Sequence, residues 1–259
     1  MPELPEVEHE RRFFAEHAAA RRVTDVVVTD AGILRNVEPE TLRSALRGRR
    51  FDDPDRHGKW LLAWTDGPVL LVHFGMTGTL EWGEDASGRH PWDRAIVVLE
   101  DGELRYRNVR KLGGLWLAHD AAEAEAILGP LGPDALDVRR RQFHDLLSRR
   151  RGQIKPVFLG QRLVAGVGNL LADEALWQAR IHPSRRIETL SDTDRDRLYD
   201  AMKAVVREAV RRRDYVRQKR RWLVSVRGTP DAACPRCGTP LVRSVVGGRT
   251  TYHCPSCQR

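Results

Sequence analysis

The sequence predicts an α+β chain of more than one domain, with a strand-rich N-terminal part, a helical middle and a small C-terminal hairpin bounded by cysteines. Three stretches, 23–30, 59–82 and 94–118, are rich in β-branched and aromatic residues, which favour strands. Several short strands at this spacing suggest a sandwich or a barrel. After about residue 119 the pattern becomes helical, and all four cysteines follow within the last 26 residues. We therefore expect a domain boundary near residue 130.

The strand-rich part also carries helix and turn signals. Residues 3–20 mix acids, arginines, phenylalanines and alanines, and suit a helix whose first turn contains Pro5. A second, short helix is predicted over residues 39–48. The dipeptides Asp66-Gly67 and Asp101-Gly102 are typical of β-hairpin turns.

The strongest predicted helix covers residues 191–212. Ser191 is expected to cap it, because Asp194 stands three residues later, in the spacing of a capping box. One apolar stripe runs along the helix and predicts a buried face without chemistry. The stripe consists of Leu198, Met202, Val205, Val206, Ala209 and Val210.

A helix–turn–helix pattern covers residues 154–184, with Gly166, Gly168 and Asn169 where the second helix begins. A glycine-rich approach to a helix N-terminus exposes backbone N–H groups, which can bind a phosphate. Alone, the pattern fits a plain tight turn better. Beside the arginines and the cysteine-bounded hairpin, phosphate binding becomes the better interpretation.

The chain of 259 residues is basic, with a formal net charge of +8 and a pI of about 9.8. The positive charge concentrates in residues 139–151 and 207–227, mainly as arginine, whose guanidinium suits phosphates. This placement favours a nucleic-acid partner over an evenly solvated basic surface. No apolar run approaches the ~20 residues of a membrane span, and no secretory signal is recognisable. We therefore expect no membrane partner and a cytoplasmic protein that associates with the nucleoid when on DNA.

The cysteines form two C-x2-C pairs, Cys234 with Cys237 and Cys254 with Cys257, separated by sixteen residues. In a chain without a secretion signal, this spacing predicts a tetrahedral site for one structural Zn²⁺. Two disulfides or four free thiols are the alternatives, and the prolines inside both short loops favour zinc. Two predicted strands around a Gly-Gly turn separate the pairs and put Arg249 at a hairpin tip. So small a unit has almost no core, and the metal would supply its folding energy.

The first residues pose a chemical question. Removal of Met1 would leave Pro2 with a free secondary amine, and an α-amine titrates at about 8, so much of it is uncharged near neutral pH. Such an amine can attack an electrophilic carbon. With an aldehyde it must form a charged iminium, an electron sink that favours elimination beside it. Glu3 could protonate a sugar ring oxygen or shuttle protons. A plain helix start explains the later acids but does not explain a terminal proline.

Motifs along almost the whole chain resemble those of the formamidopyrimidine-DNA glycosylases. They are PELPEVE at the N-terminus, HGKWLL, HFGMTGTL, GVGNLLADEAL followed by IHP, and CPRCGTPL…GRTTYHCPSCQ at the end. The resemblance implies a catalytic β-sandwich domain over residues 1–130, a helix–two-turn–helix DNA-binding domain over 131–230 and a zinc finger over 231–259. It also implies that DNA lies in the cleft between the first domain and the other two, with the damaged base flipped out of the duplex.

Position by position, the resemblance assigns chemistry to the N-terminus. Pro2 matches the Schiff-base nucleophile at the sugar C1′, and Glu3 matches its acid/base partner. Lys59 matches a lysine that contacts phosphate and donates a proton in β-elimination. Asn169 matches the phosphate-binding asparagine of the helix–two-turn–helix. Arg249 matches the finger-tip arginine that grips the phosphates beside the lesion and assists δ-elimination.

Five further residues resemble DNA contacts. Met76 and Leu112 match residues that fill the gap left by the flipped base, and Arg110 matches the arginine that contacts the orphaned base. His90 and Arg150 resemble further contacts with the DNA. Core packing is the alternative for Met76 and Leu112, and an ordinary surface charge is the alternative for Arg150.

Two segments depart from the family pattern. NVRKLG, at residues 108–113, replaces Asp-Pro-Arg-Arg-Phe-Gly, so that Leu112 stands where an aromatic residue is usual and cannot stack as one. Residues 212–233 lack the glycine-rich, tyrosine-containing stretch that covers a flipped 8-oxoguanine. The leucine of PELPE nevertheless favours the formamidopyrimidine branch over the endonuclease VIII branch, which usually has glycine there.

The sequence therefore predicts a monomeric, bifunctional DNA glycosylase and abasic-site lyase of base excision repair. It would excise oxidised or ring-opened purines from double-stranded DNA, with formamidopyrimidine as first substrate and 8-oxoguanine as a further candidate. Strand cleavage by β- or β,δ-elimination would follow. One alternative is an endonuclease VIII-like glycosylase for oxidised pyrimidines, or a lyase for abasic sites. The other is a non-catalytic zinc-finger protein that binds damaged DNA.

Overall fold

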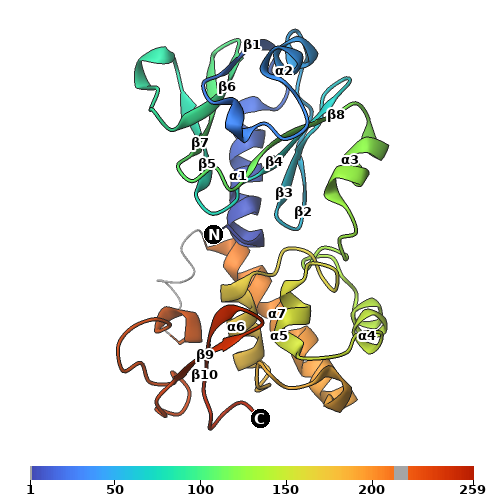
Figure 1. Cartoon of the computed structure of the whole chain (residues 1–259), viewed down its shortest axis with the longest axis vertical. Helices are drawn as coiled ribbons and strands as arrows, with labels where there is room; N and C mark the ends of the chain where they lie inside the picture. The colour runs from blue at the N-terminus through green and yellow to red at the C-terminus, as the bar shows by residue number, and fades with distance from the viewer. Residues whose placement is uncertain (1, 213–220) are drawn as a thin grey trace. The chain divides into compact units, whose positions relative to one another are not determined.

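The computed structural model describes residues 2–212 and 221–259. The chain divides into two compact units. The first comprises residues 6–129 with the N-terminal Pro2, and the second comprises residues 130–259 with Glu3–Pro5. Figure 1 shows the first unit in blue to green and the second in yellow to red.

Two four-stranded antiparallel sheets form the first unit. One sheet has the order β1-β6-β7-β5, made of Val23–Val28, Asp93–Leu99, Gly102–Asn108 and Gly78–Gly83. The other has the order β2-β3-β4-β8, made of Asp55–His57, Trp60–Ala63, Val69–His73 and Gly114–Ala118. The predicted hairpins are confirmed, because β3 pairs with β4 and β6 pairs with β7.

The apolar faces of both sheets share one core. Val26 and Val97 enter it from one sheet, and Leu61 and Val72 enter it from the other. Helices α1 (Leu4–Ala18) and α2 (Pro39–Leu46) add buried side chains to the same core, and α3 (Ala121–Leu128) packs on β8. The unit is thus a β-sandwich with flanking helices, and the barrel alternative is wrong.

The register of the first sheet brings three loops to one edge. Gly78 of β5 lies opposite Asn108 of β7, and Asp93 of β6 lies opposite Arg107 of β7. The segments 74–77, 89–92 and 109–113 therefore leave the sheet at the same end. Four candidate DNA contacts lie on these segments: Met76, His90, Arg110 and Leu112.

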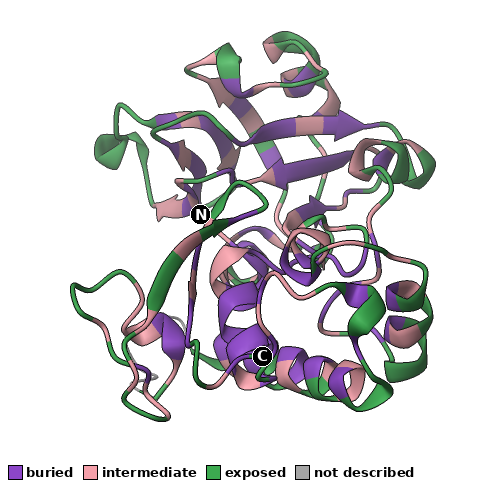
Figure 2. Cartoon of the chain, turned by 60° about the horizontal axis from the view of Figure 1, so that its bottom comes forward, coloured by how far each residue is buried: buried purple, intermediate pink, exposed green. Residues whose placement is uncertain are grey.

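The second unit is helical, with α4 (Arg140–Ser148), α5 (Ile154–Leu159), α6 (Asn169–Gln178) and α7 (Asp192–Arg211). The capping box at the start of α7 is confirmed, since Ser191 and Asp194 exchange side-chain-to-backbone hydrogen bonds. Its apolar stripe is buried in the core of the unit, as predicted. Figure 2 shows buried residues concentrated along the inner faces of these helices.

A two-stranded hairpin completes the second unit. Strands β9 (Val242–Val246) and β10 (Arg249–His253) pair antiparallel across Gly247 and Gly248. Both glycines have positive φ angles, 58° and 72°, which side chains rarely adopt. The predicted hairpin is confirmed, and Arg249 lies exposed at its tip. In the described residues, no helix is long and apolar enough to cross a membrane.

Candidate functional site

The N-terminus places a carboxylate at the start of helix α6. Glu3 is only 2% exposed. Its carboxylate accepts hydrogen bonds from the backbone N–H groups of Gly168 (3.0 Å), Leu170 (2.8 Å) and Leu171 (3.1 Å). These N–H groups have no partner inside the helix, and the helix dipole favours a negative charge beside them. The three donors favour the ionised carboxylate, directly after the half-buried Pro2.

The glycines before α6 make room for this contact. A Cβ atom on Gly168 would lie 2.2 Å from the carboxyl carbon of Glu3. The N–H of Gly166 donates to the side chain of Gln161 at 2.8 Å. The prediction that the N–H groups of Gly166 and Gly168 bind a phosphate is therefore wrong, because side chains of the protein itself take both donors. One of those side chains is 165 residues away in sequence, too far for a local pattern to reveal.

Asn169 lies beside the tip of the hairpin. Its side-chain Nδ2 donates to the carbonyl of Thr250 at 3.0 Å, one residue after Arg249. Two residues predicted to grip phosphates thus come together, although they are far apart in sequence. Their contact with DNA stays a prediction.

A buried ion cluster, which the sequence did not predict, fixes the hairpin to the helices. Lys155 of α5 and Asp173 of α6 have fully buried side chains and form an ion pair at 2.6 Å. Arg227 binds Asp173 at 2.9 Å and donates to the carbonyl of Thr250 at 2.8 Å. Lys155 also donates to Thr251 Oγ1 at 2.7 Å. Burial lowers the pKa of Lys155, and Asp173 opposes that shift. The sequence signal for this cluster was the presence of a lysine and an aspartate inside apolar helical stretches.

A second buried acid lies next to this cluster in sequence. Glu174 accepts hydrogen bonds from the backbone of Val224 (3.1 Å) and from the side chain of Gln178 (2.8 Å). Burial raises the pKa of Glu174 to about 7. The residue anchors the short helical turn Leu223–Ser225, which belongs to the divergent segment 212–233. Within that segment, residues 213–220 lie outside the described part of the chain.

The four cysteines converge at the base of the hairpin. Their Sγ atoms all lie within 4.8 Å of one another. Cys237 and Cys254 approach to 3.5 Å, and the indole N–H of Trp177 donates to Cys234 Sγ at 3.3 Å. Four sulfurs gathered in this way fit the tetrahedral ligand set of a structural zinc, and an N–H donor to one of them is a typical supporting contact.

In the first unit, Lys59 lies in the turn between β2 and β3. His73, on β4 opposite Trp60, is a neighbour that the sequence did not single out. Burial, aided by the charge of Lys59, lowers the pKa of His73 to about 4, so this imidazole is neutral at physiological pH. Lys59 in the turn thus lies near a neutral histidine on β4.

The candidate gap-filling residues are exposed. Met76 is 39% exposed and Leu112 is 56% exposed, so the core-packing alternative is wrong for both. Arg110 is also exposed, and its guanidinium forms no ion pair or hydrogen bond with any described residue. His90 is exposed, and Arg150 donates to the carbonyl of Arg162 at 3.1 Å.

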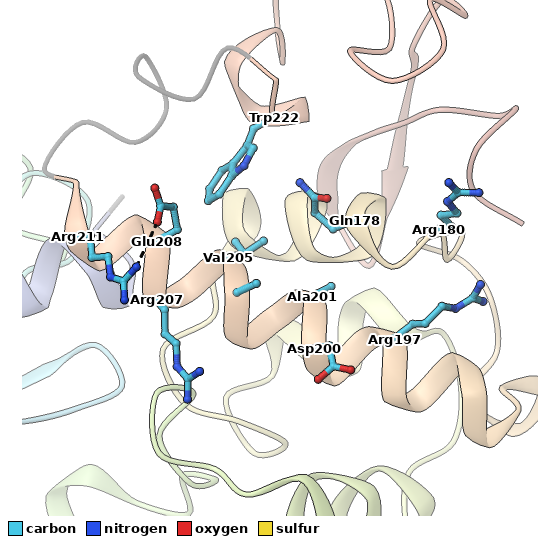
Figure 3. A pocket seen from close by; sticks show the side chains of 11 residues that line it. Gln178, Arg180, Arg197, Asp200, Ala201, Val205, Arg207, Glu208, Arg211 and Trp222 are labelled. Carbon is cyan, nitrogen blue, oxygen red and sulfur yellow. Dashed lines mark ion pairs between the residues drawn. The ribbon is translucent and has the colours of Figure 1, made fainter.

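A groove of the second unit lies elsewhere. It has a volume of about 950 Å³ and runs along α7, with Trp222 on one side. Figure 3 shows arginines at its rim, among them Arg211 paired with Glu208. It contains none of the residues predicted for the site. This groove is therefore not the candidate catalytic site.

Comparison with known families covers most of the chain. The family model described as "Formamidopyrimidine-DNA glycosylase N-terminal domain" matches residues 1–115, and "Formamidopyrimidine-DNA glycosylase H2TH domain" matches residues 131–220. The model "Zinc finger found in FPG and IleRS" matches residues 233–259.

Individual proteins agree with these matches. Formamidopyrimidine-DNA glycosylase of Heliobacterium modesticaldum is 37% identical over 282 residues, covering 100% of both chains. The enzyme of the same name from Geobacter sulfurreducens is 37% identical over 274 residues, again covering both chains fully. Among solved structures, Lactococcus lactis formamidopyrimidine-DNA glycosylase bound to DNA with an abasic site superposes with a TM-score of 0.91. It is 28% identical and covers 99% of both chains.

The β-sandwich, the helix–two-turn–helix and the zinc finger together define a chain built like a DNA-repair glycosylase. The protein belongs to the formamidopyrimidine-DNA glycosylase family, as the sequence motifs predicted. Its four cysteines form the site of one structural zinc ion.

Proposed function

We propose that the protein is a DNA glycosylase of base excision repair that also cleaves the strand at abasic sites. The observation that carries the proposal is the N-terminal Pro2 beside a carboxylate held by three backbone N–H groups at α6. A structural role for Glu3 does not require a proline before it. The relatives are named formamidopyrimidine-DNA glycosylase, and solved neighbours contain DNA with an abasic site or with a formamidopyrimidine lesion.

The chemistry begins at the secondary amine. Part of the Pro2 amine is uncharged near neutral pH, because an α-amine titrates at about 8, and this uncharged nitrogen is nucleophilic. That nitrogen attacks the sugar C1′, the bond from C1′ to the base breaks, and the base leaves with its electron pair and takes up a proton. Glu3 takes the proton that the Pro2 nitrogen loses and passes it to the ring oxygen O4′. The bond from C1′ to O4′ then breaks, the ring opens, and an iminium forms between Pro2 and C1′.

The iminium makes the next bond easier to break. It acidifies the proton on C2′, whose loss expels the 3′ phosphate by β-elimination. Lys59 would contact the phosphate and supply a proton. Arg249 and Asn169, brought together at the hairpin tip, would hold the neighbouring phosphates, and Arg249 would assist loss of the 5′ phosphate by δ-elimination. Water then releases Pro2 from the remaining sugar fragment. His90 and Arg150 would contribute further contacts with the DNA.

We assign residues 1–130 to catalysis, 131–230 to DNA binding and 231–259 to the zinc finger. We expect the protein to act as a monomer in the cytoplasm, and on the nucleoid when bound to DNA. Sedimentation of the protein with one damaged duplex should give a single complex of one chain per duplex.

The preferred lesion is a ring-opened purine in this proposal. Leu112, which replaces an aromatic residue, and the divergent segment 212–233 distinguish this chain from an efficient 8-oxoguanine enzyme. Duplexes that each carry one lesion provide the test: formamidopyrimidine, 8-oxoguanine, thymine glycol or an abasic site. We expect formamidopyrimidine to be excised fastest. Preference for thymine glycol would instead support the endonuclease VIII alternative, and cleavage of abasic sites alone would support a lyase.

A further inference from the structure

Exposed apolar side chains gather at one edge of the first unit. Among the described residues, six large hydrophobic side chains are exposed, and four of them lie on the three loops that leave the sheet together. Single exposed apolar residues are ordinary on a protein surface, whereas a group of them marks a contact surface. We call this group the loop-edge patch; it consists of Met76, Trp92, Val109 and Leu112.

One buried residue joins the three loops of the loop-edge patch. Asn108 is 0% exposed. Its backbone N–H donates to the carbonyl of Trp92 at 2.9 Å. Its side-chain Oδ1 accepts hydrogen bonds from Thr77 Oγ1 (3.2 Å) and from the backbone N–H of Lys111 (2.9 Å). The Thr77 hydroxyl in turn accepts the backbone N–H of Arg110 at 3.2 Å. Trp92 and Arg110 are therefore positioned by the same residue.

Trp92 differs from every other tryptophan of the chain. All seven lie in the described residues, and only Trp92 is exposed, at 44%. Two hydrogen bonds fix the turn that contains Trp92. The backbone N–H of His90 donates to the Asp93 carboxylate at 2.7 Å, and the backbone N–H of Trp92 donates to His90 Nδ1 at 3.2 Å. The His90 and Trp92 rings lie 4.9 Å apart. The turn therefore presents the indole to solvent in a defined position.

We propose that Trp92 contacts DNA directly, with its indole face packed on a base or deoxyribose of the duplex next to the position contacted by Arg110. This inference rests on the proposed function. An aromatic face suits the flat surfaces of nucleotides, and stacking of this kind tolerates any sequence. The Arg110 guanidinium at the same edge has no ion-pair partner among the described residues and supplies positive charge, which favours negatively charged DNA over an apolar protein partner.

The test measures affinity for a duplex that contains a tetrahydrofuran analogue of the abasic site. We expect Trp92→Ala to weaken binding roughly tenfold, because base–aromatic stacking is lost. Trp92→Phe, which keeps an aromatic face, should retain most of the affinity. The slope of log affinity against log salt should stay unchanged in Trp92→Ala, because an indole releases no counterions. It should become shallower by about one in Arg249→Ala, which removes a predicted phosphate contact.

Tryptophan fluorescence provides a readout that a merely structural role would not move. We expect DNA binding to change the emission of the wild-type protein, and Trp92→Phe to lose most of that change. Trp64→Phe is the matched control, since Trp64 is half-buried outside the loop-edge patch and donates to Asp55 at 2.9 Å. It should keep both the affinity and the fluorescence change.

The inference and the proposed function fail in different ways. If the wild-type protein forms a borohydride-trapped adduct while Trp92→Ala binds the duplex with wild-type affinity, the Trp92 contact is refuted and the enzyme remains. If no adduct forms in any variant, the proposed function is refuted whatever Trp92 contacts. Equal fluorescence changes in Trp92→Phe and wild type would also overturn the contact.

Discussion

In the first unit, the loop-edge patch and Arg110 are exposed, and the Arg110 guanidinium has no ionic partner among the described residues. In the second unit, Asn169 and the hairpin tip are instead tied to a buried cluster of Lys155, Asp173 and Arg227. The two regions should therefore respond differently to substitution, one in affinity for DNA and the other in folding stability. A substitution in the loop-edge patch should lower affinity for DNA and leave stability unchanged, whereas a substitution in the buried cluster should lower stability first.

The zinc finger should show the largest effect. Cys257→Ser removes one of four ligands, and structural zinc contributes about 10 kcal/mol or more to the folding of small finger units. We expect the zinc content to fall from one ion per chain to none and DNA binding to weaken strongly, because Arg249 loses its position. Metal analysis and a binding titration check this, with the neighbouring Ser256→Ala as control. Unchanged binding would show that the finger is dispensable.

The buried ion cluster should be the next most sensitive feature. Asp173→Asn leaves the ammonium of Lys155 buried without its counter-ion, which typically costs about 3–5 kcal/mol. The free energy of unfolding, measured with urea, should fall by that amount. Asp200→Asn is the matched control, because Asp200 pairs with Arg140 on the surface, and exposed pairs contribute about 1 kcal/mol or less.

A combined variant sharpens this prediction. Lys155→Met, Asp173→Leu and Arg227→Met together remove all three charges of the cluster and should recover part of the lost stability, since buried ionic groups can be replaced by apolar side chains. Equal stability of Asp173→Asn and the wild type would contradict the contrast between the two units.

Glu174 adds a pH dependence to the second unit. Its pKa is raised from 4.5 to about 7 in the folded protein, so the folded state binds a proton that the unfolded state has released. The contribution of Glu174 is therefore fully present below pH 4.5 and is lost as the pH rises through 7. We expect the wild type to lose up to about 3 kcal/mol relative to Glu174→Gln over this range. Urea unfolding at several pH values measures it, and parallel curves would refute it.

Arg110 should show the smallest effect on stability. Arg110→Ala removes an exposed side chain without partners among the described residues, and surface substitutions of this kind change stability by about 0.5 kcal/mol or less. Affinity for a duplex with an abasic site should nevertheless fall roughly tenfold, as expected for the loss of one well-placed arginine contact. A lowered melting temperature with unchanged affinity for DNA would contradict the assignment of Arg110 as a DNA contact without a structural role.

Local patterns predicted much of the fold. The capping box at Ser191, the glycine turn of the hairpin and the paired cysteines depend on residues close together in sequence, and all three are confirmed. The family motifs then indicated the sandwich and the helix–two-turn–helix, which neither composition nor periodicity could specify.

The rest depended on contacts between distant residues. Glu3 meets Gly168 only after folding, and this contact replaced the phosphate expected there. Lys155, Asp173 and Arg227 come from three separate segments, so no spacing rule could group them. Exposure of Met76 and Leu112 was equally undecidable, because an apolar residue in a loop fits both a core and a contact surface.

The most direct measurement concerns Pro2 itself. Protein whose N-terminal proline has been verified by mass spectrometry is incubated with duplex DNA containing an abasic site and reduced with borohydride. We predict a covalent adduct of one chain per strand, and none when Met1 is retained, because the Pro2 nitrogen is then an amide. Absence of an adduct from the protein with a free N-terminal proline would contradict the proposed mechanism.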